Sequence, residues 1–518
     1  MLIKVKTFSL QGVSATPVEV EVDVSGRGVA KSKEDEGKTT IVGLAETVVR
    51  ESAFRVKLAI ANSGFGVPAG DVVVNLAPAD LPKHAASFDL PISLGEIAAS
   101  GQFASERLEQ YAVVGELALD GSTRPCRGVL ASALAAARAG LRGILVPAAN
   151  ASEAAIVEGI DAIPISRLND AVGFLSGALE IEPKAGLSDA LFERLSQYDV
   201  DFADVLGQES AKRAATIAAA GAHNMLMIGP PGTGKTMLAK RVPTILPPPT
   251  LDEALETTQI YSAVGKINGE APLVATRPFR EPHHSISAPG LVGGGAKPTP
   301  GEISLAHNGV LFLDELPEFR RTTLEAMRQP LEDGKATISR AARTETFPAN
   351  FVLIAAMNPC PCGYRNDPRR ACRCSTGQIE KYMARVSGPL LDRIDIHIET
   401  PPVSYLELSS DAPRTTSAEI REQVLKARAI QAERYAGSTI RTNAQMRRRE
   451  LERWAKLDDA GRSVLESAMN EFGFSARAHD KILRVARTIA DLEGAENIET
   501  PHLFEAIGYR ALDRKLWT

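Results

Sequence analysis

One glycine-rich segment of the sequence has the residue types and spacing that could bind the phosphates of a nucleotide. The apolar run Leu226–Ile228 precedes the stretch GPPGTGKT, and helical periodicity follows it. This fits the pattern G-x-x-x-x-G-K-[ST] in the strand, loop and helix context that it requires. Glycines let backbone N–H groups surround phosphate oxygens, the lysine reaches the β- and γ-oxygens, and the last hydroxyl binds Mg²⁺. The predicted binding residues for ATP and Mg²⁺ are Gly229, Pro230, Pro231, Gly232, Thr233, Gly234, Lys235 and Thr236.

Two further apolar runs end in polar residues that a nucleotide site needs. Val310–Leu313 is followed directly by Asp314 and Glu315. At the end of a buried strand, we expect Asp314 to bind Mg²⁺ together with Thr236, and Glu315 to activate water. A third apolar run ends in Asn358, whose amide could orient the attacking water, although an asparagine after a strand is usually only a turn residue.

Four of the five cysteines lie close together in the sequence, at Cys360, Cys362, Cys372 and Cys374. Four thiolates in a reducing compartment would form a tetrahedral Zn²⁺ site, which we therefore include as a possible structural metal. The C-x-C spacing departs from the more usual C-x₂-C. The alternative is four free cysteines in a flexible basic loop.

Length and composition exclude several classes of protein. At roughly 150 residues per domain, 518 residues suggest about three or four domains. The 44% hydrophobic and 24% charged residues are ordinary for a globular protein and exclude collagen-like or disordered chains. No apolar run is long enough to span a membrane, and no secretory signal opens the chain, so we expect a cytoplasmic protein without a membrane partner. The net charge of -5 means that nucleic-acid binding would require a local basic surface.

The hydrophobic pattern divides the chain into three unlike parts and contains no internal repeat. Alternation from Val18 to Val24, the run 72–76 as a buried strand, and a helix-to-strand transition after Leu130 indicate a mixed α/β domain over 1–185. Linker-like stretches near 181–186 and 401–416 bound a P-loop core over 195–400. The remaining 415–518 has charged amphipathic stretches and few strand signals, which is typical of a helical bundle.

Several motifs together resemble the magnesium-chelatase-like branch of the AAA+ ATPases. They are GPPGTGKT, LFLDE, AAMN at 355–358 and PLLDRIDIHIE at 389–399. More closely, the stretch 277–319 and the tail SARAHDKILRVARTIADLEG resemble the ComM/YifB family. This resemblance covers nearly the whole chain. The resemblance implies an α/β fold class: a Lon-protease-like (ribosomal S5 domain 2-like) N-terminal α+β domain, an AAA+ P-loop α/β core and a C-terminal helical lid carrying a second sensor.

The resemblance also implies a hexameric ring and assigns roles to three residues. Asn358 would be the first sensor, Arg393 the arginine finger of a neighbouring site, and Arg477 the second sensor. Such arginines neutralise charge that develops on the transferred phosphoryl group. Arg385 competes with Arg393 for the finger role, and an ordinary surface ion network around Arg393 is the alternative.

Loops of the P-loop core could contact a DNA substrate. The sequence Glu332–Lys335, followed by strand-like residues up to Arg340, predicts a β-hairpin of the kind that lines the pore in related rings. Lys335 and Arg340 are the candidate contacts to single-stranded or branched DNA, against the alternative of solvated turn residues. The adjacent His283 and His284 could suggest a metal site, but no third ligand is evident in the sequence. We therefore expect them to belong to a structural or DNA-contacting loop.

The N-terminal domain resembles the proteolytic domain of Lon and the matching domain of RadA-type proteins, through GELALDG at 115–121 and the stretch 128–155. Lon-type sites need a serine nucleophile and a lysine base. Ser87 falls at the serine position, but Leu130 falls where the lysine should be, so we expect no proteolysis. A basic run at 447–449 is expected to be an ordinary solvated helix face.

These observations favour an ATP-dependent DNA motor, a helicase that promotes branch migration of recombination intermediates during natural transformation. The ATPase half of this hypothesis follows from the residues, and the branch-migration half from the resemblance. Alternatives are a magnesium-chelatase-type or chaperone-like ATPase that remodels a protein partner.

Overall fold

The computed structural model describes residues 2–510 and 512, apart from 27, 33, 45–46, 82, 84–85, 105, 296–297, 341–342, 366, 368 and 410–412. The chain forms two compact units. The first unit comprises residues 1–195 and 251–275, and the second unit comprises residues 196–250 and 276–518. Among the described residues, no helix is long and apolar enough to cross a membrane.

The described residues of the first unit form a seven-stranded mixed sheet in the order β3-β4-β2-β1-β5-β8-β9. Strands β1 and β2 form an antiparallel hairpin, and β5, β8 and β9 continue the sheet in parallel. The strands are β1 (Ile3–Gln11), β2 (Ser14–Val24), β3 (Glu36–Val42), β4 (Gly70–Ala77), β5 (Tyr111–Val113), β8 (Gly143–Pro147) and β9 (Asp161–Ile165), with the small pair β6 (Glu116–Leu117) and β7 (Thr123–Arg124) outside it.

The alternation of valines in β2 predicts a strand with one buried face, and the structure confirms it. Val20 and Val22 are fully buried while the intervening residues are partly exposed. The prediction of a buried strand over 72–76 is correct for the strand and for one of its faces, where Val72, Val74 and Leu76 are buried. Val74 is buried but Val73 is 47% exposed, because β4 covers the core with one face only.

Helices cover both faces of this sheet. One apolar cluster joins α1, α2 and α5 to the sheet, and another joins α3, α4 and α9. Helix α9 follows the P-loop helix in the sequence and lies within residues 195–400, which the sequence analysis assigned to the P-loop core. In the structure it packs against α3 of the first unit. The helices are α1 (Thr47–Asn62), α2 (Asp89–Ala99), α3 (Val129–Arg138), α4 (Ala151–Ala154), α5 (Leu168–Ser176), α6 (Asp189–Leu195) and α9 (Leu251–Ala263).

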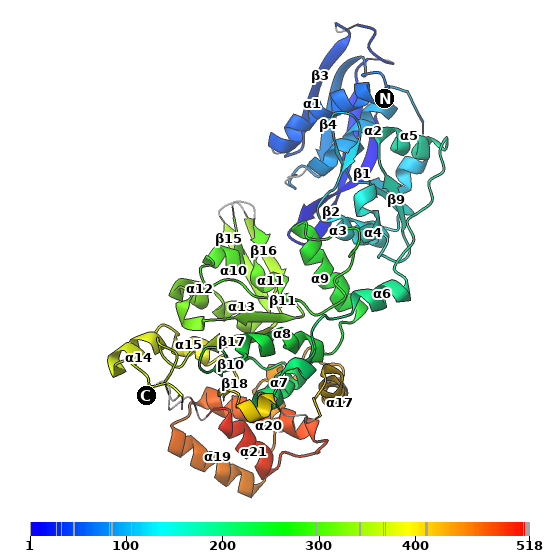
Figure 1. Cartoon of the computed structure of the whole chain (residues 1–518). Coiled ribbons are helices and arrows are strands. Elements are labelled where there is room, and N and C mark those ends of the chain that lie inside the picture. The colour runs from blue at the N-terminus through cyan, green and yellow to red at the C-terminus, as the bar shows by residue number, and fades with distance from the viewer. Residues whose placement is uncertain are drawn as a thin grey trace. The chain divides into compact units, whose positions relative to one another are not determined.

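The described part of the second unit is built on a five-stranded parallel sheet in the order β11-β14-β17-β10-β18 (Figure 1). The strands are β10 (Met225–Ile228), β11 (Phe279–Arg280), β14 (Val310–Leu313), β17 (Val352–Met357) and β18 (Ile396–Glu399). The three central strands are buried along their whole length, which explains why they read as short continuous apolar runs. Because the strands are parallel, the residues that follow β10, β14 and β17 meet at one edge.

Helices pack on both faces of the second sheet, and the C-terminal helices share one apolar cluster with α7 and α8. The predicted helical C-terminal region is therefore confirmed (Figure 1). The helices are α7 (Glu209–Gly221), α8 (Lys235–Ile245), α10 (Ala288–Val292), α11 (Glu302–Leu305), α12 (Arg321–Ala326), α13 (Arg328–Asp333), α14 (Thr376–Met383), α15 (Gly388–Leu391), α16 (Tyr405–Leu408), α17 (Ser417–Arg434), α18 (Arg448–Trp454), α19 (Asp459–Phe472), α20 (Ala476–Leu492) and α21 (Thr500–Gly508).

Two hairpin-like pairs complete the second unit: β12 (Gly293–Gly294) with β13 (Thr299–Pro300), and β15 (Lys335–Arg340) with β16 (Arg343–Pro348). The predicted hairpin exists, but its turn does not lie at Glu332–Lys335. Those residues end α13, where Gly334 takes a left-handed conformation with φ 64° and stops the helix. The two strands instead pair from Lys335–Pro348 at one end to Arg340–Arg343 at the other.

A buried ionic cluster connects the C-terminal helices to the sheet. Asp395, just before β18, forms an ion pair of 2.9 Å with Lys481 Nζ of α20. Its carboxylate also lies 3.4 Å from His223 Nδ1. Burial alone would raise the pKa of Asp395, but the charge of Lys481 and the hydrogen bonds outweigh it and hold that pKa far below its usual range. The carboxylate is therefore charged in the folded chain, and this contribution to stability is lost as the pH falls below the unfolded pKa of about 4.

Replacing Asp395 with asparagine is expected to lower the free energy of unfolding by about 3 to 5 kcal/mol, because it leaves the Lys481 ammonium buried without its counter-charge. Urea unfolding followed by tryptophan fluorescence would measure the change, since Trp454 at the end of α18 belongs to the second unit. Asp459→Asn is the matched control, because the Asp459 side chain is fully exposed. Equal urea midpoints for the two variants would contradict the prediction.

Candidate nucleotide-binding site

The glycine-rich loop leaves β10 and enters α8, as the sequence predicted. A Cβ atom added at Gly229 would lie 2.3 Å from the carbonyl oxygen of Thr400, so only glycine fits there. Gly232 and Gly234 have φ angles of 79° and 85°. A Cβ atom at Gly232 would meet nothing within 4 Å. The backbone in the middle of the loop is thus open on one side, which is the cradle that phosphate oxygens require.

Lys235 lies at the start of α8 with its ammonium group inside the loop. Its Nζ donates hydrogen bonds to the carbonyls of Gly229, at 2.7 Å, and Pro230, at 2.8 Å, and lies 3.4 Å from Asn358 Oδ1. Burial lowers the pKa of Lys235 to about 8, and the charge of Asp314 partly opposes this shift. A phosphate group near Nζ would add negative charge and favour the ammonium form. The residues present therefore fit a triphosphate.

The two predicted Mg²⁺ ligands meet although they are far apart in the sequence. Thr236 Oγ1 donates a hydrogen bond of 2.7 Å to Asp314 Oδ2. A hydroxyl and a carboxylate are oxygen ligands of the type that Mg²⁺ uses beside a nucleotide. The donor set at this edge of the sheet therefore fits a magnesium ion held by Thr236 and Asp314.

Glu315 lies directly beyond the magnesium ligands, in a backbone conformation that is unusual for a residue with a side chain. Its φ of 52° is left-handed, and its N–H donates to Asp314 Oδ1 at 2.9 Å. Its carboxylate is exposed and lies 3.2 Å from His284 Nδ1. Such conformations are uncommon and concentrate at functional sites. The contact with His284 was missed by sequence reasoning, which treated the histidine pair only as part of a loop.

A cavity of about 580 Å³ adjoins the glycine-rich loop. Its walls include the apolar residues Val205, Leu206 and Met237, next to Gly232. Gln208 shapes this side of the loop, because its amide donates to the carbonyls of Thr233 and Pro401. An apolar pocket with a few polar groups beside a phosphate site is suited to a nucleotide base. No motif signalled these residues, since they come from separate segments of the chain.

The predicted arginines make ion pairs with carboxylates outside the glycine-rich loop. Arg393 is 13% exposed, contacts Glu332, and donates to the Pro389 carbonyl. Arg385 is 50% exposed and pairs with Glu318 at 2.7 Å. Arg477, at the start of α20, lies 3.6 Å from Asp392. The finger and sensor roles of these arginines stay predictions.

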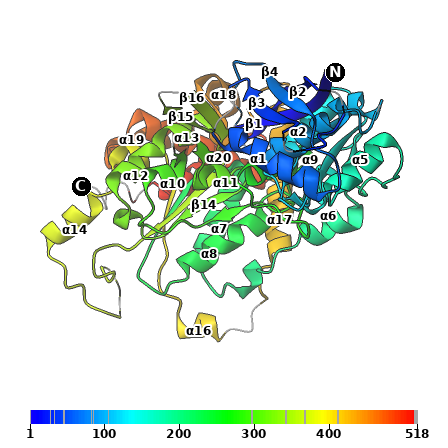
Figure 2. The same ribbon diagram turned by 90° about the horizontal axis from the view of Figure 1, so that it is seen from above.

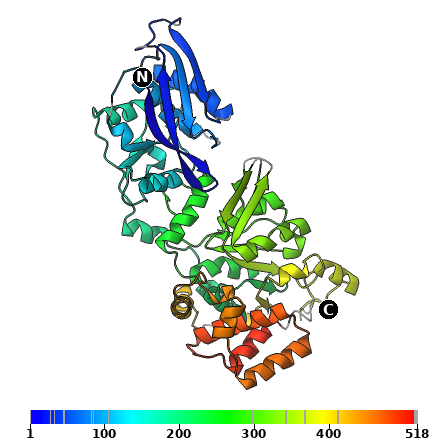
Figure 3. The same ribbon diagram turned by 180° about the vertical axis from the view of Figure 1, so that it is seen from behind.

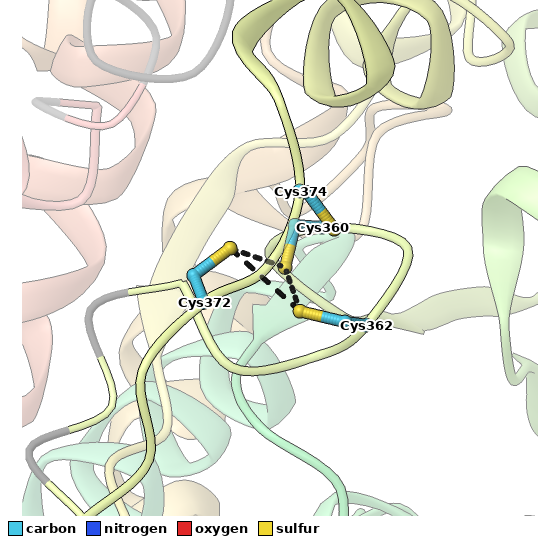
Figure 4. A group of neighbouring side chains, drawn as sticks. All are labelled: Cys360, Cys362, Cys372 and Cys374. Atoms are coloured by element: carbon cyan, nitrogen blue, oxygen red, sulfur yellow. Dashed lines mark hydrogen bonds between the residues drawn. The ribbon is translucent and has the colours of Figure 1, made fainter.

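The four clustered cysteines come together in the loop that follows Asn358 (Figure 4). Their Sγ atoms all lie within 4.8 Å of one another, and none is in a disulfide. Cys360 is buried and the other three are partly exposed. Among the described residues, this is the group of cysteine, histidine and acidic side chains whose arrangement could hold a metal ion.

The DNA-contact candidates lie at opposite ends of one strand. Lys335 begins β15 and Arg340 ends it, and both side chains are exposed. Of the two, Arg340 is the one that pairs with Arg343. In Figures 1 and 3 the hairpin extends away from the sheet of its own unit.

The first unit has a leucine where a Lon-type site would need its lysine. Leu130 lies in α3, fully buried in an apolar cluster. Ser87 lies in a short turn before α2, where its carbonyl accepts the N–H of Gly115. The expectation that this domain has no proteolytic activity stays a prediction.

The parallel sheet and the meeting of Lys235, Thr236, Asp314 and Asn358 define a P-loop protein of the magnesium-chelatase-like AAA+ class. Three family models match the chain: "Magnesium chelatase, subunit ChlI" over residues 201–408, "Subunit ChlI of Mg-chelatase" over 28–150, and "Magnesium chelatase, subunit ChlI C-terminal" over 414–510.

Whole-chain comparisons identify the family more narrowly. The chain is 47% identical to competence protein ComM of Haemophilus influenzae over 98% of its own length and 96% of that protein. It is 43% identical to YifB of Escherichia coli, covering 99% and 97% of the two chains. The chain therefore belongs to the ComM/YifB family. Lon protease 2 of Bacillus subtilis is a more distant relative, 28% identical over 34% of this chain and 35% of that protein.

Proposed function

We propose that this protein is an ATP-driven DNA motor, a helicase that promotes branch migration of recombination intermediates during natural transformation. The observation that carries the ATPase part is the meeting of Thr236 and Asp314 beside Lys235. The DNA part is supported by similarity over nearly the full length to a protein named for competence. The proposed location is the cytoplasm, which supplies ATP and keeps thiols reduced.

Each residue of the site has a definable task in this proposal. Lys235 binds the β- and γ-phosphates, and the Gly229–Thr236 backbone cradles them. Thr236 and Asp314 hold Mg²⁺, which when bound neutralises charge on the phosphate oxygens. Glu315 accepts a proton from the attacking water, and Asn358 orients that water. Hydrolysis then drives movement of the chain along its substrate.

A hexamer is part of the proposal, because the arginine finger of related ring ATPases acts on the nucleotide of a neighbouring subunit. Arg393 would complete the site of a neighbouring subunit, and Arg477 would sense the nucleotide as the second sensor. Exposed Lys335 and Arg340 on the hairpin would contact phosphates of single-stranded or branched DNA without reading sequence.

Stimulation of ATP hydrolysis by DNA is the result that tests this function. Hydrolysis would be measured for purified protein alone, with single-stranded DNA, with a branched junction and with unfolded protein. We expect DNA to stimulate the wild type, and the Lys235→Ala variant to hydrolyse no ATP under any of these conditions. The same preparations should move a junction or displace a strand only when Lys235 is intact.

Indifference of the ATPase to every form of DNA would contradict the DNA motor. The family models named for magnesium chelatase favour a second candidate in that event, an ATPase that remodels a protein partner inserting a metal. Stimulation by unfolded protein alone would identify a chaperone-like activity instead.

A further inference from the structure

The loop that carries the four cysteines begins two residues after Asn358, beside the nucleotide site. We call residues 360–374 the cysteine loop; the structure describes all of them except 366 and 368. Its described residues form neither helix nor strand between β17 and α14. Figure 2 shows the segment before α14 as an extended loop at the margin of its unit. Such a loop lacks the regular backbone hydrogen bonds that hold a helix or a strand in one conformation.

The sulfur positions have the geometry of a tetrahedral thiolate site. The Sγ atoms of Cys360 and Cys362 are 3.4 Å apart, and each lies 3.7 Å from Cys372 Sγ (Figure 4). Four sulfurs at a Zn–S distance of about 2.3 Å would be about 3.8 Å from one another. Cys374 Sγ completes the group within 4.8 Å. Chemistry and spacing therefore both match Zn²⁺.

A backbone turn brings two of the cysteines together. The Gly363 N–H donates a hydrogen bond of 2.9 Å to the carbonyl of Cys360. This bond closes a four-residue turn that contains both Cys360 and Cys362. The approach of these two sulfurs is therefore built into the backbone of the loop.

The same loop forms one wall of the nucleotide cavity. Tyr364, Asp367, Arg369 and Arg370 lie among the residues that line it. Arg370 lies over the Tyr364 ring at 5.0 Å and donates to its hydroxyl at 2.8 Å. Arg369 donates to the carbonyl of Val403, another residue of the cavity wall, at 2.7 Å.

The loop also touches the phosphate-binding segment directly. A Cβ atom on Gly363, whose φ is 85°, would lie 2.7 Å from Cδ of Pro231. Only glycine allows this approach between the cysteine loop and the glycine-rich loop. A change in the path of the cysteine loop would therefore alter both the cavity lined by Tyr364 and the glycine-rich loop at Pro231.

We propose that Cys360, Cys362, Cys372 and Cys374 bind one Zn²⁺ and that this ion holds Tyr364 and its neighbours in place as a wall of the nucleotide pocket. Nucleotide affinity then depends on metal occupancy. The metal site is independent of the proposed DNA motor, whereas its effect on affinity rests on the proposed ATP-binding function.

Metal content of the full-length protein is the first measurement. Purified wild type and Cys126→Ala should contain one zinc per chain by mass spectrometry of the metals, because Cys126 lies outside the cluster. Cys362→Ala and Cys374→Ala, chosen because both side chains are partly exposed, should contain none. Wild type without zinc, or with the four cysteines joined in disulfides, would overturn the metal site.

Binding of Mg·ADP to the same proteins tests the coupling. Both cluster variants should bind about tenfold more weakly than Cys126→Ala, the change expected when two or three contacting side chains must be ordered on binding. Chelating the metal from wild type should have the same effect and added Zn²⁺ should reverse it, which excludes misfolding of a variant. Unchanged affinity after zinc removal would overturn the coupling.

Two further variants separate the parts of the proposal. Tyr364→Ala should weaken nucleotide binding while retaining zinc, because it removes the wall and leaves the ligands. Lys235→Ala should also retain zinc although it loses the nucleotide. Zinc-loaded wild type that bound no nucleotide at all would contradict the proposed function and leave the metal site standing.

Discussion

Replacing Glu315 with glutamine is expected to slow ATP hydrolysis by about 10²- to 10⁴-fold, the usual contribution of a positioned general base. Glutamine keeps the size and shape of the side chain but cannot accept the proton of the attacking water. Affinity for Mg·ATP should change little, because Thr236 contacts Asp314 and Lys235 contacts Asn358 without the Glu315 side chain.

Single-turnover hydrolysis and equilibrium binding of Mg·ATP would separate these two effects. Glu325→Gln is the matched control, because Glu325 of α12 is a partly exposed glutamate paired with Arg328. We expect that variant to hydrolyse ATP at the wild-type rate. A rate for Glu315→Gln within tenfold of wild type would mean that another group activates water.

Replacing Arg393 with alanine is expected to have a still larger effect, about 10³- to 10⁵-fold on ATP hydrolysis, the range found for arginine fingers. The variant should still bind nucleotide, because the partners of Arg393 are Glu332 and the Pro389 carbonyl, which lie outside the glycine-rich loop. Its pairing with Glu332 holds the guanidinium in place on a single chain. On this expectation the side chain exchanges that partner for a neighbour's phosphate when subunits assemble.

Mixing two inactive variants tests whether the arginine acts on a neighbouring site. An Arg393→Ala subunit has an intact Lys235, and a Lys235→Ala subunit has an intact Arg393, so mixed rings should recover part of the activity. Arg385→Ala is the comparison, since Arg385 is more exposed and pairs with Glu318. A larger loss in Arg385→Ala, or no recovery on mixing, would contradict the role of Arg393.

The features that sequence reasoning found correctly depend on residues close together in the chain. The glycine-rich loop has its chemistry within eight consecutive residues, and each central strand is a short apolar run because both of its faces are buried. The valine alternation of β2 likewise depends only on its period. Such patterns can be read before the fold is known.

The errors arose where one local pattern permits two structures. Asp333–Gly334 is a common hairpin turn, but an Asp-Gly pair also ends helices, and here Gly334 stops α13. The run 72–76 is apolar enough for a strand buried on both faces, yet the fold covers only one face and leaves Val73 exposed. The choice in each case depended on neighbours distant in sequence.

The sequence by itself determined the nucleotide chemistry of this protein, because a motif of fixed spacing dictates a strand, a loop and a helix that present N–H groups and Lys235 to phosphate. Only the tertiary structure decided which distant residues join that chemistry. Parallel strands brought Asp314 to Thr236, a left-handed turn aimed Glu315 at His284, and the cysteine loop reached the pocket through Tyr364. Such contacts depend on which segments pack together, and no local pattern of residues along the chain predicts that choice.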